Sequence, residues 1–326
     1  MLLSRRHAIA AGTAALSLSR TVFAQTKWPE RPVTFVVPYA AGGGADIVAR
    51  ELAQLVTPLF GQSIIIDNKG GAAGGIGTTA VANARPDGYT MLYAVGTNIV
   101  LNPHVLKNYR TNTLEDLIPI VQTTDYQYVL AVHPAVPAKT VAELVALAKK
   151  EPDKLTYSSS GAGGNNHLAG ALFSAATGVK MTHVPYKGTG PALLDVINGV
   201  ITMNFSSLPP AVSQIKAGRL RALAVTGTKR VSALPDVPTL EEVGIKGATL
   251  KGWHGIFAPK GTAATIIDKV EGDVKAAMKD PKMKGALDKD GLEFPPEMTR
   301  AQFADAVRKE HAYWGAKLKE LDIKFE

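Results

Sequence analysis

Residues 32–50 read PVTFVVPYAAGGGADIVAR and contain the unit that decides the fold. The stretch 32–38 is apolar and β-branched, which predicts a short buried strand. Residues 39–46 are rich in glycine and form a turn. After the turn, Ile47, Val48, Leu52, Leu55 and Val56 recur at helical spacing and predict an amphipathic helix. A strand, a glycine turn and a helix in this order are typical of an α/β protein.

The same unit repeats along the chain. Residues 62–67 form the next predicted strand, 70–77 a second glycine loop that opens a helix, and 91–95 a third strand followed by Gly96-Thr97-Asn98. The alternation predicts a parallel sheet covered by helices on both faces.

The pattern restarts at a predicted strand, 128–133. Further strands are expected at 155–159, 182–186, 201–205, 220–225 and 252–258, and a capping box of Thr140 and Glu143 starts the helix 141–150. Gly178 ends the predicted helix 167–177.

The C-terminal tail is predicted to be helical, without strands. Thr299 and Gln302 form a second capping box, and the final helix carries a buried stripe of Phe303, Val307, His311, Trp314 and Leu318.

The economical arrangement is therefore a discontinuous first lobe, 25–125 plus 251–326, and a second lobe, 126–250. Two crossings between lobes make a hinge, and ligands of such proteins bind in the cleft between domains.

The first 24 residues have the layout of an export signal. Arg5 and Arg6 precede a short apolar run, 8–18, and Val22-Phe23-Ala24 offers small residues for cleavage after Ala24. We expect a periplasmic protein, exported by the general or the twin-arginine route. Elsewhere no stretch approaches the roughly 20 apolar residues of a membrane span.

Composition narrows the function further. The 326 residues include no cysteine, which excludes disulfides, thiolate metal sites, a cysteine nucleophile and a lipid-anchored cysteine. The net charge is +8, and removal of Arg5, Arg6 and Arg20 with the signal leaves 8 − 3 = +5. Basic residues do not cluster with aromatic ones, so a nucleic-acid partner is not expected.

Four loops lie where a predicted strand ends and a helix begins: 39–46, 70–77, 159–166 and 187–190. Ligands bind at this edge of open parallel sheets. Glycine allows backbone N–H groups to approach a ligand, and the helix start adds unpaired N–H groups and a positive dipole end. The loops predict a carboxylate or phosphate site without a charged side chain.

A dinucleotide-binding fold is the sharpest rival, because Asp67 follows the first loop at the distance of a ribose-binding acid. The glycine spacing is wrong, since Ile47 stands where the third small residue belongs. No zinc, nucleophile-elbow or phosphate-loop motif occurs, so no catalytic residue, cofactor or metal is expected. Ser213 and Lys216 fit S-x-x-K by chance, and we interpret Lys216 as a solvated helix-end residue.

Two single residues keep two interpretations. His167, near a helix start, either faces the ligand or is a hydrogen-bonded core histidine. Lys187 either pairs with an anionic ligand or is a surface lysine, and the usual exposure of lysine favours the surface. Trp253 and Trp314 are predicted to belong to the core.

The sequence resembles the periplasmic solute-binding receptors of tripartite tricarboxylate transporters, often called Bug receptors. The resemblance rests on segments that cover nearly the whole mature chain in order: 28–50, DNKGGAAGGIG (67–77), ARPDGYTML (84–92), HLAGALF (167–173), HVPYKGTGPAL (183–193), 218–239 and the helical tail.

This resemblance implies a type II periplasmic-binding-protein fold of Venus-flytrap form, without catalysis. It implies a small organic carboxylate held by backbone groups and ordered water from both lobes. The implied partner is a membrane transporter with a large and a small integral subunit, although many members look like orphans, and we expect a monomer. The positions that match the binding loops are Tyr39, Ala41, Gly42, Thr97, Asn98, Ser159, Ser160, Gly163, Asn165, Lys187, Gly188 and Ser206.

One departure bears on the ligand. The family often has Phe-Asp where this chain has Phe205-Ser206. An aspartate could accept hydrogen bonds from a ligand amino group, whereas Ser206 is uncharged. We therefore expect a di- or tricarboxylate, a hydroxy acid or an aromatic acid, rather than an amino acid.

Two other classes of function stay open at this point. One is a receptor that signals to a membrane sensor kinase, which a neighbouring gene would reveal. The other is an exported enzyme acting on a carboxylate, for which turnover would depend on Ser213 or His167.

Overall fold

The computed structural model describes residues 28–321. The predicted signal segment, with its cleavage after Ala24, lies outside these residues. Within the described part of the chain, no helix combines the length and the apolar character needed to cross a membrane.

In the part of the chain that the structure describes, nine strands form one mixed sheet in the order β2-β1-β3-β9-β4-β7-β5-β6, with β8 paired to β4. Their bounds are β1 Val33–Val37, β2 Ile64–Asn68, β3 Thr90–Val95, β4 Leu117–Val132, β5 Thr156–Ser159, β6 Thr182–Pro185, β7 Met203–Ser207, β8 Arg221–Val225 and β9 Lys251–Pro259.

Helices follow most strands, as the sequence predicts. Their bounds are α2 Gly44–Phe60, the 3-10 turn η1 Ala72–Gly74, α3 Gly75–Ala82, α4 Gly96–Val100, α5 Asn102–Val105, α6 Val141–Lys150, α7 Asn165–Thr177, α8 Thr189–Ile197, α9 Leu208–Lys216, α10 Ala264–Met278, α11 Pro281–Asp290 and α12 Arg300–Glu320.

The predicted helix ends are confirmed, although of the two predicted capping boxes the one at Thr299 is complete and the one at Thr140 is not, because the Glu143 carboxylate accepts from the Lys139 N–H. Thr140 accepts a hydrogen bond from the backbone N–H of Glu143, and Thr299 does the same for Gln302. Gly178 ends α7 in the left-handed conformation at φ 69°. In α12 the predicted stripe is buried except for His311, which is half-buried because its ring packs beside that of His104.

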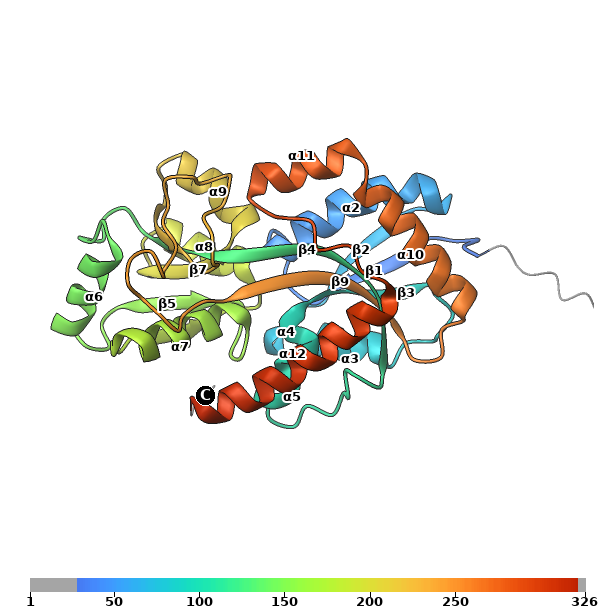
Figure 1. The fold of residues 1–326 in the computed structure, drawn as a ribbon, viewed down its shortest axis with the longest axis horizontal. Coiled ribbons are helices and arrows are strands. Elements are labelled where there is room, and N and C mark those ends of the chain that lie inside the picture. The colour runs from blue at the N-terminus through green and yellow to red at the C-terminus, as the bar shows by residue number, and fades with distance from the viewer. Residues whose placement is uncertain (1–27, 322–326) are drawn as a thin grey trace, which may run out of the picture.

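The long strand β4 runs through both lobes of the molecule (Figure 1). Its residues 117–127 pair with β9, and its residues 128–132 pair with β7 and β8. The first lobe holds β1, β2, β3 and β9 with α2 and the tail helices, and the second holds β5 to β8 with α6 to α9. The chain enters the second lobe along β4 and returns along β9. The exact boundaries at 125 and 251 stay a prediction.

The prediction of a parallel sheet is wrong at the centre of the sheet. β1 pairs in parallel with β2 and β3, and β5 with β6 and β7, but β4 and β9 run antiparallel to each other and to their other neighbours. The pattern of apolar residues hides residues 117–127, because Gln122, Thr123, Thr124 and Asp125 interrupt it. Antiparallel pairs need no helical crossover, so the alternation of strands and helices does not reveal them.

Candidate functional site

A small space, here called the cleft pocket, lies between the lobes with a volume of about 30 Å³. That is about the share of liquid volume taken by one water molecule. It is lined by Tyr39, Gly43, Gly44, Ala45, Val95 and His254 from the first lobe, Tyr126 and Tyr128 from β4, and Ser160, Asn165, Asn166, Thr189 and Ser207 from the second lobe.

Four helices begin at this pocket. Gly44 starts α2, Asn165 starts α7 and Thr189 starts α8, while Ser207 is the residue before α9. At none of these four starts does a side chain cap the helix. The first-turn N–H groups of these helices therefore have no partner within the helix, although Pro191 in α8 and Pro209 and Pro210 in α9 contribute no N–H. The positive ends of four helix dipoles converge on one space.

The fold explains why the starts meet. The parallel strands β1, β5 and β6 each run into a short loop and then into one of these helices, and β7 runs directly into α9. Parallel strands of a sheet end at the same edge, so the loops after them gather there. The two lobes face each other with these edges, which places two sets of helix starts around one cleft.

Ser207 is a polar side chain of the pocket that lacks a hydrogen-bond partner within residues 28–321. It is 8% exposed, and its Oγ has no hydrogen-bond partner among the described residues. Its neighbour across the cleft is Gly44, where an added Cβ would lie 2.7 Å from that Oγ. A buried hydroxyl without a partner is unfavourable, and a ligand oxygen in the cleft would supply one.

Aromatic residues form the floor of the pocket. The hydroxyl oxygens of Tyr126 and Tyr128 lie 2.9 Å apart, and the Asn165 amide donates to Tyr126 at 3.3 Å. The His254 ring stacks on Tyr126 with centroids 4.6 Å apart, and its Nδ1 lies 2.6 Å from Thr124 Oγ1.

These walls carry no charge at neutral pH. Burial lowers the pKa of His254 to about 3, so its imidazole is neutral. Burial likewise raises the pKa of Tyr126 and of Tyr128 above the usual phenol value. No Asp, Glu, Lys or Arg lines the pocket within residues 28–321. The positive potential therefore comes from backbone groups alone.

Of the residues implied by the family resemblance, Tyr39, Ser160 and Asn165 line the pocket. Asn98 lies behind Tyr39, where its amide donates to the Tyr39 hydroxyl at 2.9 Å and to the Ala73 carbonyl at 2.9 Å. Thr97 is also buried, and its Oγ1 lacks a partner in the described structure.

The loops 39–46 and 187–190 meet at the mouth of the cleft. The Ala40 N–H donates to the Lys187 carbonyl at 3.1 Å, a hydrogen bond between lobes. Gly188 lies against Ala40, and a Cβ added at Gly190 would lie 2.9 Å from the Ala41 carbonyl oxygen. Ala41, Gly42 and the side chain of Lys187 are exposed.

Three expected residues lie behind the second lobe's loop. Ser159 Oγ is 2.6 Å from His183 Nε2, and the Gly163 N–H donates to His167 Nδ1 at 3.1 Å. The two histidine rings stack with centroids 3.6 Å apart. His167 is 6% exposed, so the structure supports its interpretation as a hydrogen-bonded buried histidine.

Ser206 is fully buried and donates to the Ser207 carbonyl at 2.9 Å, so it adjoins the pocket without lining it. Ser213 and Lys216 are exposed on α9, as expected of a chance motif. Trp253 is buried in the core, where its indole N–H donates to Glu310 at 2.6 Å.

Sequence reasoning missed the floor of the site, namely Tyr126, Tyr128 and His254. These residues lie on the two long strands rather than on glycine loops, so loop chemistry gives no signal for them. Asn166, Thr189 and Ser207 were also missed, although each is the next residue along from a predicted one. The helix starts carried the signal that could have found them.

Comparison with known proteins gives the family. The model of the tripartite tricarboxylate transporter family receptor matches residues 48–323. An Agrobacterium vitis protein from the ttuE-ttuC' intergenic region is 41% identical over 261 residues, 79% of this chain and 74% of its own. Protein BugT of Bordetella pertussis is 30% identical over 317 residues, 96% of each chain.

Solved structures agree with this. The R. palustris protein Rpa4515 with adipate is 33% identical with a TM-score of 0.87, covering 91% of this chain and 99% of its own. MatC from Rhodopseudomonas palustris with bound malate is 29% identical with a TM-score of 0.85, covering 89% and 99%. The chain thus has the periplasmic-binding-protein fold and belongs to the tripartite tricarboxylate transporter receptor family, the Bug-type solute-binding receptors.

Proposed function

We propose that this receptor works in the periplasm, where it captures a small organic carboxylate in the cleft pocket and delivers it to a membrane transporter. The observation that carries the proposal is the meeting of four uncapped helix starts around the unpartnered hydroxyl of Ser207. Helix N-termini bind carboxylates through backbone N–H groups and the dipole. We propose Tyr39, Ser160, Asn165, Thr189 and Ser207 as ligand-contacting residues.

The ligand class follows from what the cleft offers. An amino acid brings an ammonium group that needs an acidic or strongly accepting partner, and no carboxylate lines the pocket among the described residues. Ser206 adds none, since it is neutral and turned to the Ser207 carbonyl. A di- or tricarboxylate, a hydroxy acid or an aromatic acid therefore suits the site. Adipate and malate, bound by two solved relatives, fall in this class.

Binding requires the lobes to separate first. A pocket of about 30 Å³ is far smaller than the several hundred Å³ that ligand sites usually offer. The contacts between the loops 39–46 and 187–190 are backbone contacts, which can part and reform without rearranging long side chains. A hinge at β4 and β9 would carry this motion.

No catalytic step is part of this proposal. The Ser159–His183 contact resembles part of a catalytic dyad, but both residues lie behind the loop rather than in the pocket. Burial also lowers the pKa of His183 to about 4, which makes it a weak base. The receptor would release its ligand unchanged to a partner with a large and a small integral subunit, and would act as a monomer.

Isothermal titration calorimetry of the mature protein tests the ligand class. The panel pairs acids with their amino counterparts: malate and succinate against aspartate, glutarate against glutamate, with adipate, citrate and benzoate added. We expect at least one organic acid to bind about tenfold or more tightly than the amino acid of equal length. A clear preference for aspartate or glutamate would contradict the proposal.

Delivery is tested separately, by uptake of the radiolabelled acid that binds best. Cells lacking the receptor gene should lose uptake and regain it with the wild-type gene. Light scattering after size exclusion checks the monomer. Unchanged uptake in the deleted strain would argue for a sensory receptor instead.

A further inference from the structure

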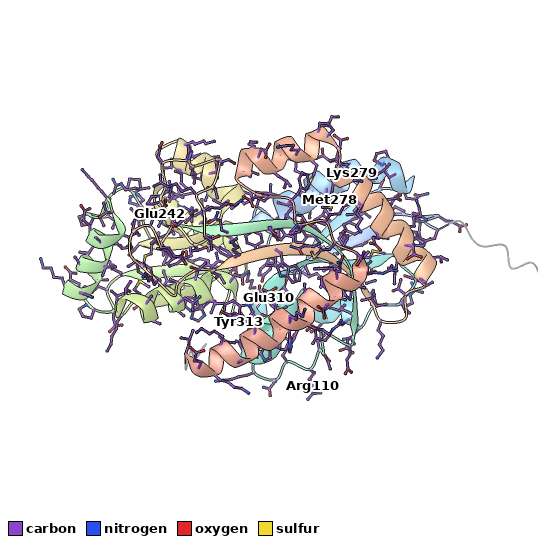
Figure 2. The ribbon with its side chains drawn as sticks, in the orientation of Figure 1. Arg110, Glu242, Met278, Lys279, Glu310 and Tyr313 are labelled. Carbon is purple, nitrogen blue, oxygen red and sulfur yellow. The ribbon has the colours of Figure 1, made fainter. Side chains whose placement is uncertain are left out.

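A second and much larger pocket lies away from the cleft and shares no residue with it. It is formed by β4, the end of α10, the start of α11, the linker 292–299 and Phe303 of α12, and we call it the tail pocket. Met278 and Lys279 mark its place at the end of α10, in the first lobe (Figure 2). Its volume is about 520 Å³. This lies within the range of roughly 300–1,000 Å³ that small-molecule sites occupy.

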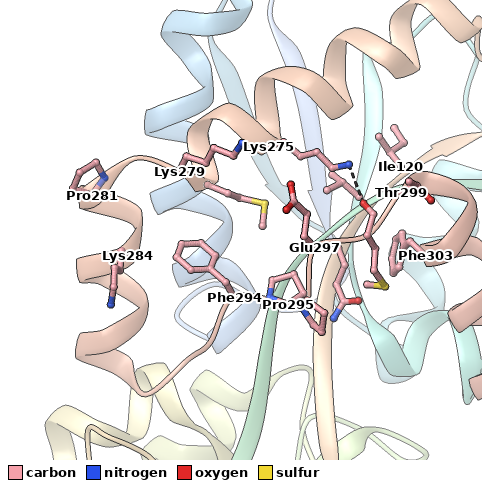
Figure 3. A pocket seen from close by; sticks show the side chains of 15 residues that line it. Ile120, Lys275, Lys279, Pro281, Lys284, Phe294, Pro295, Glu297, Thr299 and Phe303 are labelled. Atoms are coloured by element: carbon pink, nitrogen blue, oxygen red, sulfur yellow. Dashed lines mark hydrogen bonds between the residues drawn. The ribbon is translucent and has the colours of Figure 1, made fainter.

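Apolar side chains make up its walls. Phe294 and Pro295 line one side and Phe303 closes the far end, as Figure 3 shows. Met278 and Met298 also line the pocket and are only half-buried. Methionine side chains are flexible and polarisable, so they adapt to apolar ligands of differing shape.

The proline-rich linker forms one side of this pocket. Pro295 and Pro296 fix the backbone after Phe294, and Lys275 of α10 donates to the Met298 carbonyl at 3.0 Å. This bond, drawn dashed in Figure 3, ties the linker to α10. At its start the linker pairs with β4, where the backbone groups of Asp125 and Glu293 exchange two hydrogen bonds of 2.8 and 3.0 Å. The linker is thereby tied to both β4 and α10.

Among the described residues, the charges around the pocket leave one lysine ammonium without an acidic partner. Three lysines, Lys275, Lys279 and Lys284, line it against one acid, Glu297. Lys275 pairs with Glu271 and Lys284 with Asp288, each on its own helix. Within residues 28–321, the Lys279 ammonium has no acidic partner. Lys279 is exposed at the end of α10, so it can meet an anionic head while the walls bury an apolar body.

We propose that the tail pocket is a second ligand site, for a carboxylate with an extended apolar body such as a medium-chain fatty acid. The head would pair with Lys279 and the chain would lie between Met278, Phe294 and Met298. A small polar acid of the kind expected in the cleft has no apolar body to bury and should not bind here. The site is independent of the proposed cleft function.

Decanoate, kept below its micelle-forming concentration, is the probe. Mature protein labelled with ¹³C at methionine methyl groups is titrated and followed by NMR. The Met278 and Met298 signals should shift in a saturable way. The Met181 signal should not, because Met181 lies next to β6 in the second lobe. Absence of saturable shifts at Met278 and Met298 would overturn the proposal.

Lys279→Glu tests the ion pair on an exposed position that cannot endanger the fold. It should weaken decanoate binding about tenfold, since it replaces an attraction by a repulsion. Lys282→Glu, a nearby exposed lysine outside the pocket, is the matched control and should leave binding unchanged. Equal binding by Lys279→Glu and wild type would overturn the anion assignment.

Two further binding measurements test whether another kind of ligand, or another site, explains the result. Decyltrimethylammonium has the same chain with a cationic head, and it should bind at least about tenfold more weakly. Equal binding would mean a purely apolar surface, suited to a protein side chain, and would sink the proposal. Ser207→Asp should leave decanoate binding intact. Its loss in that variant would place decanoate in the cleft.

Discussion

The cleft pocket and the tail pocket differ in size, in the character of their walls and in the source of their positive charge. The cleft offers about 30 Å³, walls that mix aromatic and polar groups and, among the described residues, no charged side chain. The tail pocket offers about 520 Å³, largely apolar walls and three lysines beside one acid. The cleft attracts an anion through backbone dipoles of helices that two moving lobes bring together. The tail pocket belongs to one lobe and is bordered by a proline-rich linker. The difference suggests a rule for a site that forms when two lobes close. Backbone N–H donors and glycine suit such a site, because the lobes must approach within contact distance and long side chains would keep them apart.

Ser207→Asp should produce the largest effect and break the cleft side of this comparison. The new carboxylate would occupy the helix starts and repel a ligand anion, lowering affinity for the best organic acid about 100-fold or more, roughly 2.7 kcal/mol. Calorimetry measures the loss. Ser207→Asn, neutral and of similar size, is the control and should lose far less. Equal loss in both would mean that shape, not charge, governs the site.

Gly190→Ala should block closure without harming the fold. Gly190 lies in the first turn of α8 without positive φ, so alanine suits the backbone, but its Cβ would lie 2.9 Å from the Ala41 carbonyl oxygen. We expect ligand affinity to fall about tenfold, roughly 1.4 kcal/mol, as the closed state becomes strained. Small-angle scattering with ligand should show a larger radius of gyration than wild type.

Gly285→Ala is the control for that variant. Gly285 lies within α11, where an added Cβ meets nothing within 4 Å. Binding should be unchanged and thermal stability slightly raised. If Gly190→Ala binds and compacts like Gly285→Ala, the contact between the loops is not part of closure.

Asp125 of β4 links the two regions, since Gln122 lines the tail pocket and Tyr126 lines the cleft. Burial raises the pKa of Asp125 to about 6. The folded protein therefore holds a proton between pH 4 and 6 that the unfolded chain releases, and stability falls as pH rises through this window. Asp125→Asn should remove that loss. A shift of about two pKa units corresponds to at most about 3 kcal/mol, and the partial exposure of Asp125 lowers the expected gain in stability at pH 8 to about 1 kcal/mol.

Chemical denaturation at pH 4.5 and pH 8 measures this difference, with the exposed Asp236→Asn as the control. The gain of Asp125→Asn over wild type should be greater at pH 8. A gain that is the same at both values would mean that the carboxyl does not change protonation on unfolding.

The smallest effect concerns pH and binding. Because burial holds the pKa of His254 at about 3, the imidazole stays neutral above pH 5. The affinity of the cleft for an acid that is fully ionised across the range, such as succinate at pH 7 and 8.5, should change less than about twofold. Calorimetry at the two values suffices, and a tenfold loss would point to a titrating group in the site.

Much of this could be predicted from sequence. The unit at 32–50 and its repeats specified the strand–loop–helix order, and the shared edge of parallel strands implied that the loops would gather. Tyr39, Ser160 and Asn165 follow from that reasoning together with the family resemblance. The capping boxes at Thr140 and Thr299 marked helix starts because their geometry is local.

The rest depends on contacts distant in sequence. The first half of β4 has polar residues that no apolar period reveals, so the antiparallel centre of the sheet and the floor residues Tyr126 and His254 stayed hidden. The tail pocket arises where the irregular linker 292–299 crosses between α10 and β4. Prolines there signal irregular backbone, but not how far it stands from its neighbours.

A crystal structure of the mature protein with the organic acid that binds best by calorimetry tests the central claim most directly. The account predicts closed lobes around the acid, with a carboxylate within hydrogen-bond distance of Ser207 Oγ and of first-turn N–H groups from α2 and α8. A carboxylate held instead by Lys279 in the tail pocket, or by a charged side chain drawn into the cleft, would contradict it.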